Sequence, residues 1–198
     1  MKRINGNGQV RLGLVMLLLA LLIGSIAFAW QMSLMSAMDS NSMSYGLVDL
    51  TAELLMERDA DWTAGFWHDA YNMMLRKLGH FCEYLLIGAI SSLFFLTWFE
   101  RMLQRWWGRH ADKAIRLRRF ATTLAAACVA FILSFMASFA DEFYWQRLSQ
   151  RHPRWFDVGV DMAGAMLGIL LCVIVFSLGR WSAGEKRTVR EIARGERE

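Results

Sequence analysis

Four long apolar runs, separated by polar segments, dominate the pattern of hydrophobic and polar positions along the chain. The runs cover residues 12–30, 78–99, 120–140 and 158–178. A helix needs about 20 predominantly apolar residues to cross a bilayer, and a helix satisfies its own backbone hydrogen bonds there. The pattern therefore predicts an all-α membrane protein with four transmembrane helices.

The composition is typical of a small multi-pass membrane protein without a separate soluble domain. Of the 198 residues, 56% are hydrophobic and 20% are charged, and the charged residues lie mostly between the apolar runs. We expect a transmembrane domain over residues 1–178, embedded in the lipid bilayer, and a charged cytoplasmic tail over residues 179–198. The net charge of +4 indicates no nucleic-acid partner, because the basic residues flank apolar runs and form no recognition face.

The distribution of Lys and Arg predicts the orientation in the membrane. The N-terminal segment, the loop over residues 100–119 and the C-terminal tail together hold 16 of the 22 basic residues. Because short cytoplasmic loops carry the excess of Lys and Arg, both termini and this middle loop are expected in the cytoplasm. The loops over residues 31–77 and 141–157 are then expected on the outer side.

Two segments allow more than one interpretation. The basic start of the first run and its Ala27-Phe28-Ala29 ending fit a cleavable signal peptide, but its length and Trp30 favour an uncleaved anchor. In the first outer loop, four leucines recur at helical spacing and predict a short amphipathic surface helix, with a solvated connector as the alternative. These leucines are Leu47, Leu50, Leu54 and Leu55.

The second run carries ionisable residues at its outer end. Lys77, His80 and Tyr84 follow the spacing i, i+3, i+7, which places them on one helical face, with Glu83 beside it. Glu83 lies about five residues into the run, roughly 7–8 Å deep at 1.5 Å per residue. At that depth a carboxylate needs a partner or a cavity, so this end of the run is a candidate site.

One helical face of the fourth run carries acidic residues at its expected outer end and glycines below them. Asp157, Asp161, Gly164 and Gly168 lie at i, i+4, i+7 and i+11. The two glycines form a G-x-x-x-G pair, which permits close approach of another helix. We therefore expect tight helix packing directly below the two carboxylates.

The third run ends at Asp141 and Glu142, and Arg151 follows in the expected outer loop. Ionisable groups thus gather in one leaflet on three runs. Charged groups inside a membrane are costly, so such a cluster indicates a functional site by default. The structural alternative is a set of interhelical ion pairs that fixes the bundle.

An enzyme and a binding module are both compatible with these groups. In an enzyme, His80 would transfer protons, a desolvated Glu83 or Asp161 would assist, and Lys77 and Arg151 would hold a phosphate. No nucleophile motif is present, and the sequence assigns no cofactor.

In a binding module, the same groups would hold a lipid head group or a cation. His80-x-x-Glu83 with Asp141, Asp157 and Asp161 offers nitrogen and oxygen ligands for a divalent ion, but the spacing matches no dedicated metal motif. No metal ligands are therefore assigned. We take the catalytic candidates to be His80, Glu83, Asp141, Glu142 and Asp161. We take the substrate-binding candidates to be Lys77, Tyr84, Arg151 and Asp157.

These residues resemble the two signatures of the VanZ-like family. The segment from Lys77 to Tyr84 resembles K-x-x-H-F-x-E-Y, and the segment from Asp141 to Gly168 resembles D-E…R…D-x-x-x-N-x-x-G-x-x-x-G. The likeness covers residues 10–178, with the motifs in matching order and spacing. The resemblance implies a small integral membrane protein of the bacterial cell envelope and assigns no reaction. Together with the distribution of Lys and Arg, it leads us to expect an inner-membrane protein whose polar site faces outward toward a lipid-linked or envelope substrate. It also implies a link to resistance against the glycopeptide teicoplanin, for which the family is named.

The chain departs from the family pattern at two positions. Asp161 stands where the family commonly has Asn, which adds a carboxylate. The family's Gln usually follows the first acidic residue by four positions, where this chain has Trp145. Gln146 comes one residue later, so the spacing does not assign it to the site.

Overall fold

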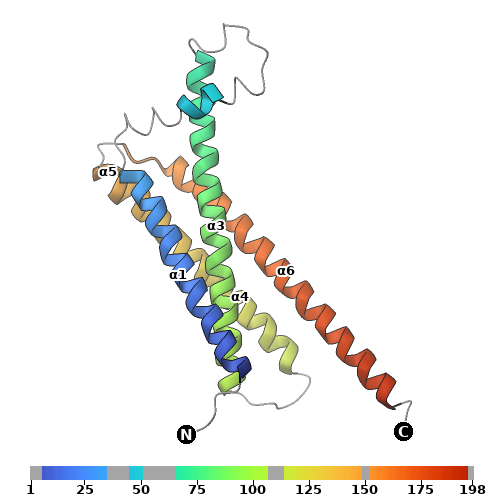
Figure 1. Cartoon of the computed structure of the whole chain (residues 1–198). Coiled ribbons are helices and arrows are strands. Elements are labelled where there is room, and N and C mark those ends of the chain that lie inside the picture. The colour runs from blue at the N-terminus through green and yellow to red at the C-terminus, as the bar shows by residue number, and fades with distance from the viewer. Residues whose placement is uncertain (1–5, 35–44, 51–65, 107–113, 149–151, 196–198) are drawn as a thin grey trace.

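The described residues of the computed structural model form four long helices (Figure 1). They are α1 (Gly6–Leu34), α3 (Phe66–Trp106), α4 (Ala114–Ala140) and α6 (Trp155–Gly195). A π-helical turn, η2 (Asp141–Trp145), and one further helical turn, α5 (Gln146–Leu148), extend α4. The structure describes residues 6–34, 45–50, 66–106, 114–148 and 152–195.

Each long helix contains a segment that is long and apolar enough to cross a membrane. These segments are Leu12–Leu34, Asp69–Met102, Leu117–Leu148 and Trp155–Gly179. The predicted all-α architecture with four candidate spans is confirmed, and the spans imply a lipid bilayer environment. Each segment exceeds its apolar run, because helical hydrogen bonding continues through the polar residues at the ends of the run.

The four helices alternate in direction, so the start of α1 and the end of α6 lie at the same end of the bundle (Figure 1). The opposite end holds η2, α5 and the beginning of α6. There α3 extends beyond the other helices, and the helical turn at residues 45–50 lies beside this extension. The domain boundary expected at residue 178 falls inside α6, which continues as one helix to Gly195.

The closest helix contact is between α3 and α6, and three glycines make it possible. A Cβ atom on Gly164 would lie 2.2 Å from the Phe81 carbonyl oxygen, and one on Gly168 would lie 2.1 Å from that of Leu85. On the facing helix, a Cβ on Gly88 would lie 2.3 Å from the Ala165 carbonyl oxygen. The backbones of the two helices therefore touch, as the G-x-x-x-G spacing predicted.

Helix α1 packs into the bundle through one side and leaves its other side exposed. Val15, Leu18, Leu22 and Ala29 are buried in the core. Trp30 donates a hydrogen bond from its indole nitrogen to the Ala137 carbonyl oxygen at 3.2 Å. This bond joins the end of α1 to α4 one turn before the π-helical segment.

One expectation about the connecting segments needs revision, and another is met in part. The segment after Ala140 was expected to be an outer loop, but it stays helical through Leu148 because the backbone passes directly from α4 into η2 and α5. The expected amphipathic helix corresponds to the helical turn at residues 45–50, where Leu47 and Leu50 are exposed and Val48 is buried. Leu54 and Leu55 lie outside the described residues.

Candidate functional site: buried carboxylates beside a histidine

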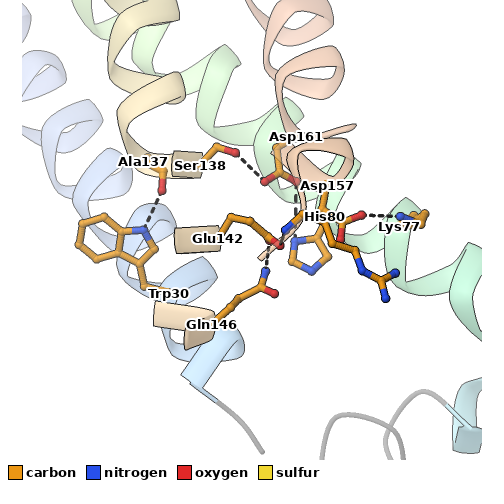
Figure 2. Close-up of polar contacts among 10 residues, drawn as sticks. Trp30, Lys77, His80, Ala137, Ser138, Glu142, Gln146, Asp157 and Asp161 are labelled. Atoms are coloured by element: carbon orange, nitrogen blue, oxygen red, sulfur yellow. Dashed lines mark hydrogen bonds and ion pairs between the residues drawn. The ribbon is translucent and has the colours of Figure 1, made fainter. Parts of the chain in front are cut away.

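Three buried carboxylates meet at the end of the bundle opposite the chain ends. Asp141 and Glu142 come from η2 and Asp161 comes from α6, and each is only 1% exposed. His80 approaches them from α3 (Figure 2). Because buried carboxylates are costly, the partners of each oxygen indicate what the group does.

One carboxylate oxygen of Asp161 accepts a hydrogen bond, and the other faces His80. Its Oδ2 accepts a hydrogen bond of 2.8 Å from the hydroxyl of Ser138 on α4. Its Oδ1 faces Nδ1 of His80 at 3.7 Å, which is too long for a hydrogen bond, and accepts none from the described residues. The serine thus fixes the orientation of Asp161 and directs Oδ1 toward the histidine.

Ser138 was not among the residues expected at the site, although the sequence contains a signal for it. Ser134 and Ser138 interrupt the otherwise apolar stretch 124–140 of α4, and with Glu142 of η2 they lie at i, i+4 and i+8; all three are buried. A polar stripe in a membrane helix faces protein rather than lipid. The stripe therefore marks the face of α4 that points to the site.

Both carboxylate oxygens of Glu142 accept hydrogen bonds from neighbouring segments of the chain. Its Oε1 accepts a hydrogen bond of 2.6 Å from the backbone N–H of Arg154, and its Oε2 accepts one of 2.5 Å from the side-chain amide of Gln146. The first bond reaches the residue just before α6, and the second reaches α5. Glu142 therefore ties the end of the α4 extension to the entry of α6 (Figure 2).

The π-helical turn explains why Gln146 joins this network. The backbone N–H of Gln146 bonds to the Asp141 carbonyl oxygen, five residues earlier, where an α-helix would use the residue four earlier. This wider turn accommodates one extra residue, so Gln146 takes the face that position 145 would occupy in an α-helix. Trp145 instead packs its ring against Trp30, with centroids 5.4 Å apart. The structure thus joins Gln146 to Glu142 by a hydrogen bond, which the sequence spacing did not predict.

Lys77 and Asp157 form an ion pair between α3 and α6 at the edge of the cluster (Figure 2). Their side chains are 28% and 26% exposed, and the Lys77 ammonium also lies 4.4 Å from the centre of the Phe156 ring. Because both side chains are partly exposed, the pair contributes only modestly to stability. Its position at the edge leaves both groups accessible from outside the bundle.

The remaining candidates divide according to their surroundings. Tyr84 is fully buried and lies within electrostatic range of Asp141 and Asp161. Glu83 is half-buried and makes no hydrogen bond or ion pair with any residue that the structure describes. It therefore stays apart from the hydrogen-bonded network, because its position on α3 is one residue off the face that carries His80 and Tyr84. Arg151 lies outside the described residues.

His80, Asp141 and Asp161 together form a compact set of nitrogen and oxygen donors. One ligand atom from each residue lies within 4.8 Å of the other two. The side chain of His80 is 25% exposed and that of Asp161 is 2% exposed. The set is therefore reachable from the His80 side and closed behind the two carboxylates.

The helices and this cluster define a class of protein: a small α-helical membrane protein with a polar site buried at one end of its bundle. The VanZ/LLP1 family model matches residues 12–176, and the chain therefore belongs to the VanZ/LLP1 family. The match extends from α1 into α6 and includes every described residue of the site. No curated protein and no solved structure matches the chain.

Proposed function

We propose that this protein is a multi-pass protein of the bacterial inner membrane that recognises and processes the head group of a lipid-linked envelope substrate. The site would open to the outer leaflet, and the activity would contribute to glycopeptide resistance of the teicoplanin type. The observation that carries the proposal is the burial of three carboxylates beside His80, two contributed by η2 and one by α6. A membrane bundle that needed only stability would be expected to replace such groups with apolar ones.

The outward orientation rests on the basic residues and on the direction of the helices. The excess of Lys and Arg in the terminal segments and the middle loop favours a cytoplasmic location for these parts. The start of α1 and the end of α6 lie at the same end of the bundle, and the carboxylate cluster lies at the other end (Figure 1). A cytoplasmic pair of termini would therefore put the cluster at the outer leaflet.

Reporter fusions test this orientation directly. We expect fusions made after Leu34, Trp106, Leu148 and Gly195 to report outer, cytoplasmic, outer and cytoplasmic locations in that order. The reason is that charged cytoplasmic segments resist translocation. The measurement is paired alkaline phosphatase and fluorescent protein activity, and the opposite order would place the site at the cytoplasmic face.

The chemistry of the site suits a polar head group that carries an anionic part. Because imidazole is the side-chain group that most often acts as a general acid and base in proteins, His80 is the residue best suited to transfer a proton. Lys77, at the accessible edge, can exchange its contact with Asp157 for a phosphate oxygen. Asp161 and Ser138 would hold the imidazole side of the site in place while the substrate enters from the edge.

An apolar groove on the described surface supports the proposal that the substrate carries a lipid chain. The groove has a volume of about 480 Å³ and lies between α4 and α6. It is lined by Ala127, Cys128, Phe131, Ile132, Met166, Ile169, Leu170 and Val173. Phe131 lies two helical turns before Ser138, about 10 Å along α4. An acyl or isoprenoid chain in this groove would therefore have its head group near the cluster.

A purely structural function has support at two of the described carboxylates, Glu142 and Asp157. Glu142 bonds to Gln146 and Arg154, and Asp157 pairs with Lys77, so these carboxylates already have partners within the protein. Asp161 differs, because one of its oxygens accepts no hydrogen bond from the described residues. We therefore assign the chemistry to His80, Asp141 and Asp161, and the bracing of the bundle to Glu142 with Gln146 and Arg154.

A matched pair of histidine substitutions tests the proposed function. We expect His80→Gln to abolish the protection against teicoplanin that the protein gives a sensitive bacterial host, because glutamine cannot transfer a proton near neutral pH. The control, His152→Gln, changes an exposed histidine before α6 and should keep full protection. The measurements are the minimum inhibitory concentration and the amount of protein in the membrane. Loss of membrane protein in His80→Gln, or equal protection by both variants, would refute the proposal.

A further inference from the structure

Two carboxylates lie beside His80, and Oδ1 of one of them, Asp161, accepts no hydrogen bond from the described residues. Asp161 directs Oδ1 toward His80 Nδ1 at 3.7 Å, and one ligand atom of Asp141 lies within 4.8 Å of both. Lys77, the neighbouring described ammonium, is engaged with Asp157 at the edge. Two carboxylates in a space with little water repel each other unless a cation or a shared proton lies between them.

The arrangement of the donors fits a metal ion better than it fits direct hydrogen bonds. Metal bonds to histidine nitrogen and carboxylate oxygen are about 2.0–2.2 Å long, so neighbouring ligand atoms of a tetrahedral site lie about 3.4 Å apart. The 3.7 Å between Asp161 Oδ1 and His80 Nδ1 is close to that separation. It is too long for a hydrogen bond. A small inward movement of Asp141 would complete the third bond.

The surroundings of Asp161 have the features of a supported metal ligand. Ser138 donates to Oδ2 at 2.8 Å, which fixes the carboxylate and leaves Oδ1 to point into the space between the three residues. Such outer hydrogen bonds commonly orient metal ligands. The partial exposure of His80 provides a path by which an ion and a fourth ligand, such as water or a substrate oxygen, can enter.

We propose that His80 Nδ1, Asp141 and Asp161 Oδ1 bind one divalent transition-metal ion of the Zn²⁺ or Mn²⁺ type. One imidazole with two carboxylates suits these ions, whereas Mg²⁺ and Ca²⁺ prefer oxygen ligands alone. The role of the ion rests on the proposed function: it holds a phosphate or carbonyl oxygen of the head group at its open position. Binding of the ion itself does not depend on that role.

Metal binding to the purified full-length protein in detergent tests the proposal. The protein is stripped with a chelator, and Zn²⁺ and Mn²⁺ are added separately. Bound metal is then measured by mass spectrometry, and Co²⁺ replaces Zn²⁺ for absorption spectroscopy. We expect about one metal ion per chain and a Co²⁺ spectrum of four-coordinate type, since three protein ligands and one exchangeable ligand are available.

Two variants and one control locate the site. Asp161→Asn keeps the shape of the side chain and an oxygen for the Ser138 hydrogen bond, and it should weaken binding at least about tenfold, the minimum that even outer-shell changes cost. His80→Gln should remove the spectrum. The control is Asp157→Asn on the same helix, which removes a carboxylate that pairs with Lys77 and should leave the metal affinity unchanged. Melting temperatures show that each variant is folded.

The outcomes separate this proposal from the proposed function. One ion per chain, lost in Asp161→Asn and His80→Gln and kept in Asp157→Asn, supports the metal site whatever the resistance assay gives. No bound ion in the folded wild-type protein overturns the metal site. Equal binding by all variants overturns it as well. A bound ion without any effect on teicoplanin protection refutes the proposed function and leaves the metal site standing.

Discussion

Replacing Gly164 or Gly168 with alanine should destabilise the protein severely and reduce its amount in the membrane. The added Cβ would lie 2.2 Å or 2.1 Å from a carbonyl oxygen of α3, and a backbone oxygen in a helix cannot turn away as a side chain can. The two helices must separate, which lowers the free energy of unfolding by about 3 kcal/mol or more where both backbones are fixed. The measurements are the melting temperature in detergent and the membrane level of the protein.

The same substitution at another glycine of α6 provides the control. A Cβ on Gly159 meets no atom within 4 Å, so Gly159→Ala introduces no clash. This substitution should raise the free energy of unfolding by about 0.5–1 kcal/mol, because alanine is the better helix former. If Gly168→Ala melted at the same temperature as Gly159→Ala, then α3 and α6 would not touch as closely as described.

Glu142→Ala should be the most damaging change among the carboxylates. The substitution removes two hydrogen bonds to a buried charge, each worth about 1.5–3 kcal/mol, and leaves the Gln146 amide and the Arg154 N–H without their acceptor. We expect a loss of about 3 kcal/mol or more in the free energy of unfolding, measured by thermal or denaturant unfolding in detergent. Proteolysis should show first at the junction between α5 and α6, because that is where the bonds are lost.

Glu142→Gln distinguishes a structural role from a chemical one. Its amide oxygen can still accept the Arg154 N–H, and its NH₂ group can donate to the Gln146 oxygen once that amide turns over. We therefore expect Glu142→Gln to regain most of the stability, and the teicoplanin protection, that Glu142→Ala loses. A stable Glu142→Gln protein without protection would instead assign Glu142 a chemical role and contradict its description as a brace.

The architecture follows from the sequence because bilayer physics leaves few alternatives. An apolar run of about 20 residues must form a spanning helix, since no other local structure satisfies its backbone in lipid. The spacing of Gly164 and Gly168 likewise marked the tight face of α6, because only the small residues of a helix allow another backbone to approach. Helical periodicity also placed His80 and Tyr84 on one face of α3.

The partners of each carboxylate could not be predicted in the same way. The sequence treats Asp141, Glu142, Asp157 and Asp161 as one acidic group, because charge and depth are all that a single helix reveals. Their oxygens have different surroundings only because different segments face them: the Arg154 backbone and Gln146 for Glu142, Lys77 for Asp157 and Ser138 for Asp161. These contacts depend on the rotation of each helix about its axis.

By itself, the sequence determined that this protein has four helical spans, a tight contact along α6 and an acidic end near His80. The tertiary structure decided which side chains form the site. It put one extra residue into a π-helical turn, which brought Gln146 to Glu142 and turned Trp145 toward Trp30. It also left Glu83 outside the hydrogen-bonded network. The physical reason is that hydrophobicity and helical spacing are properties of one segment, whereas the pairing of buried polar atoms depends on the register between segments that only packing fixes.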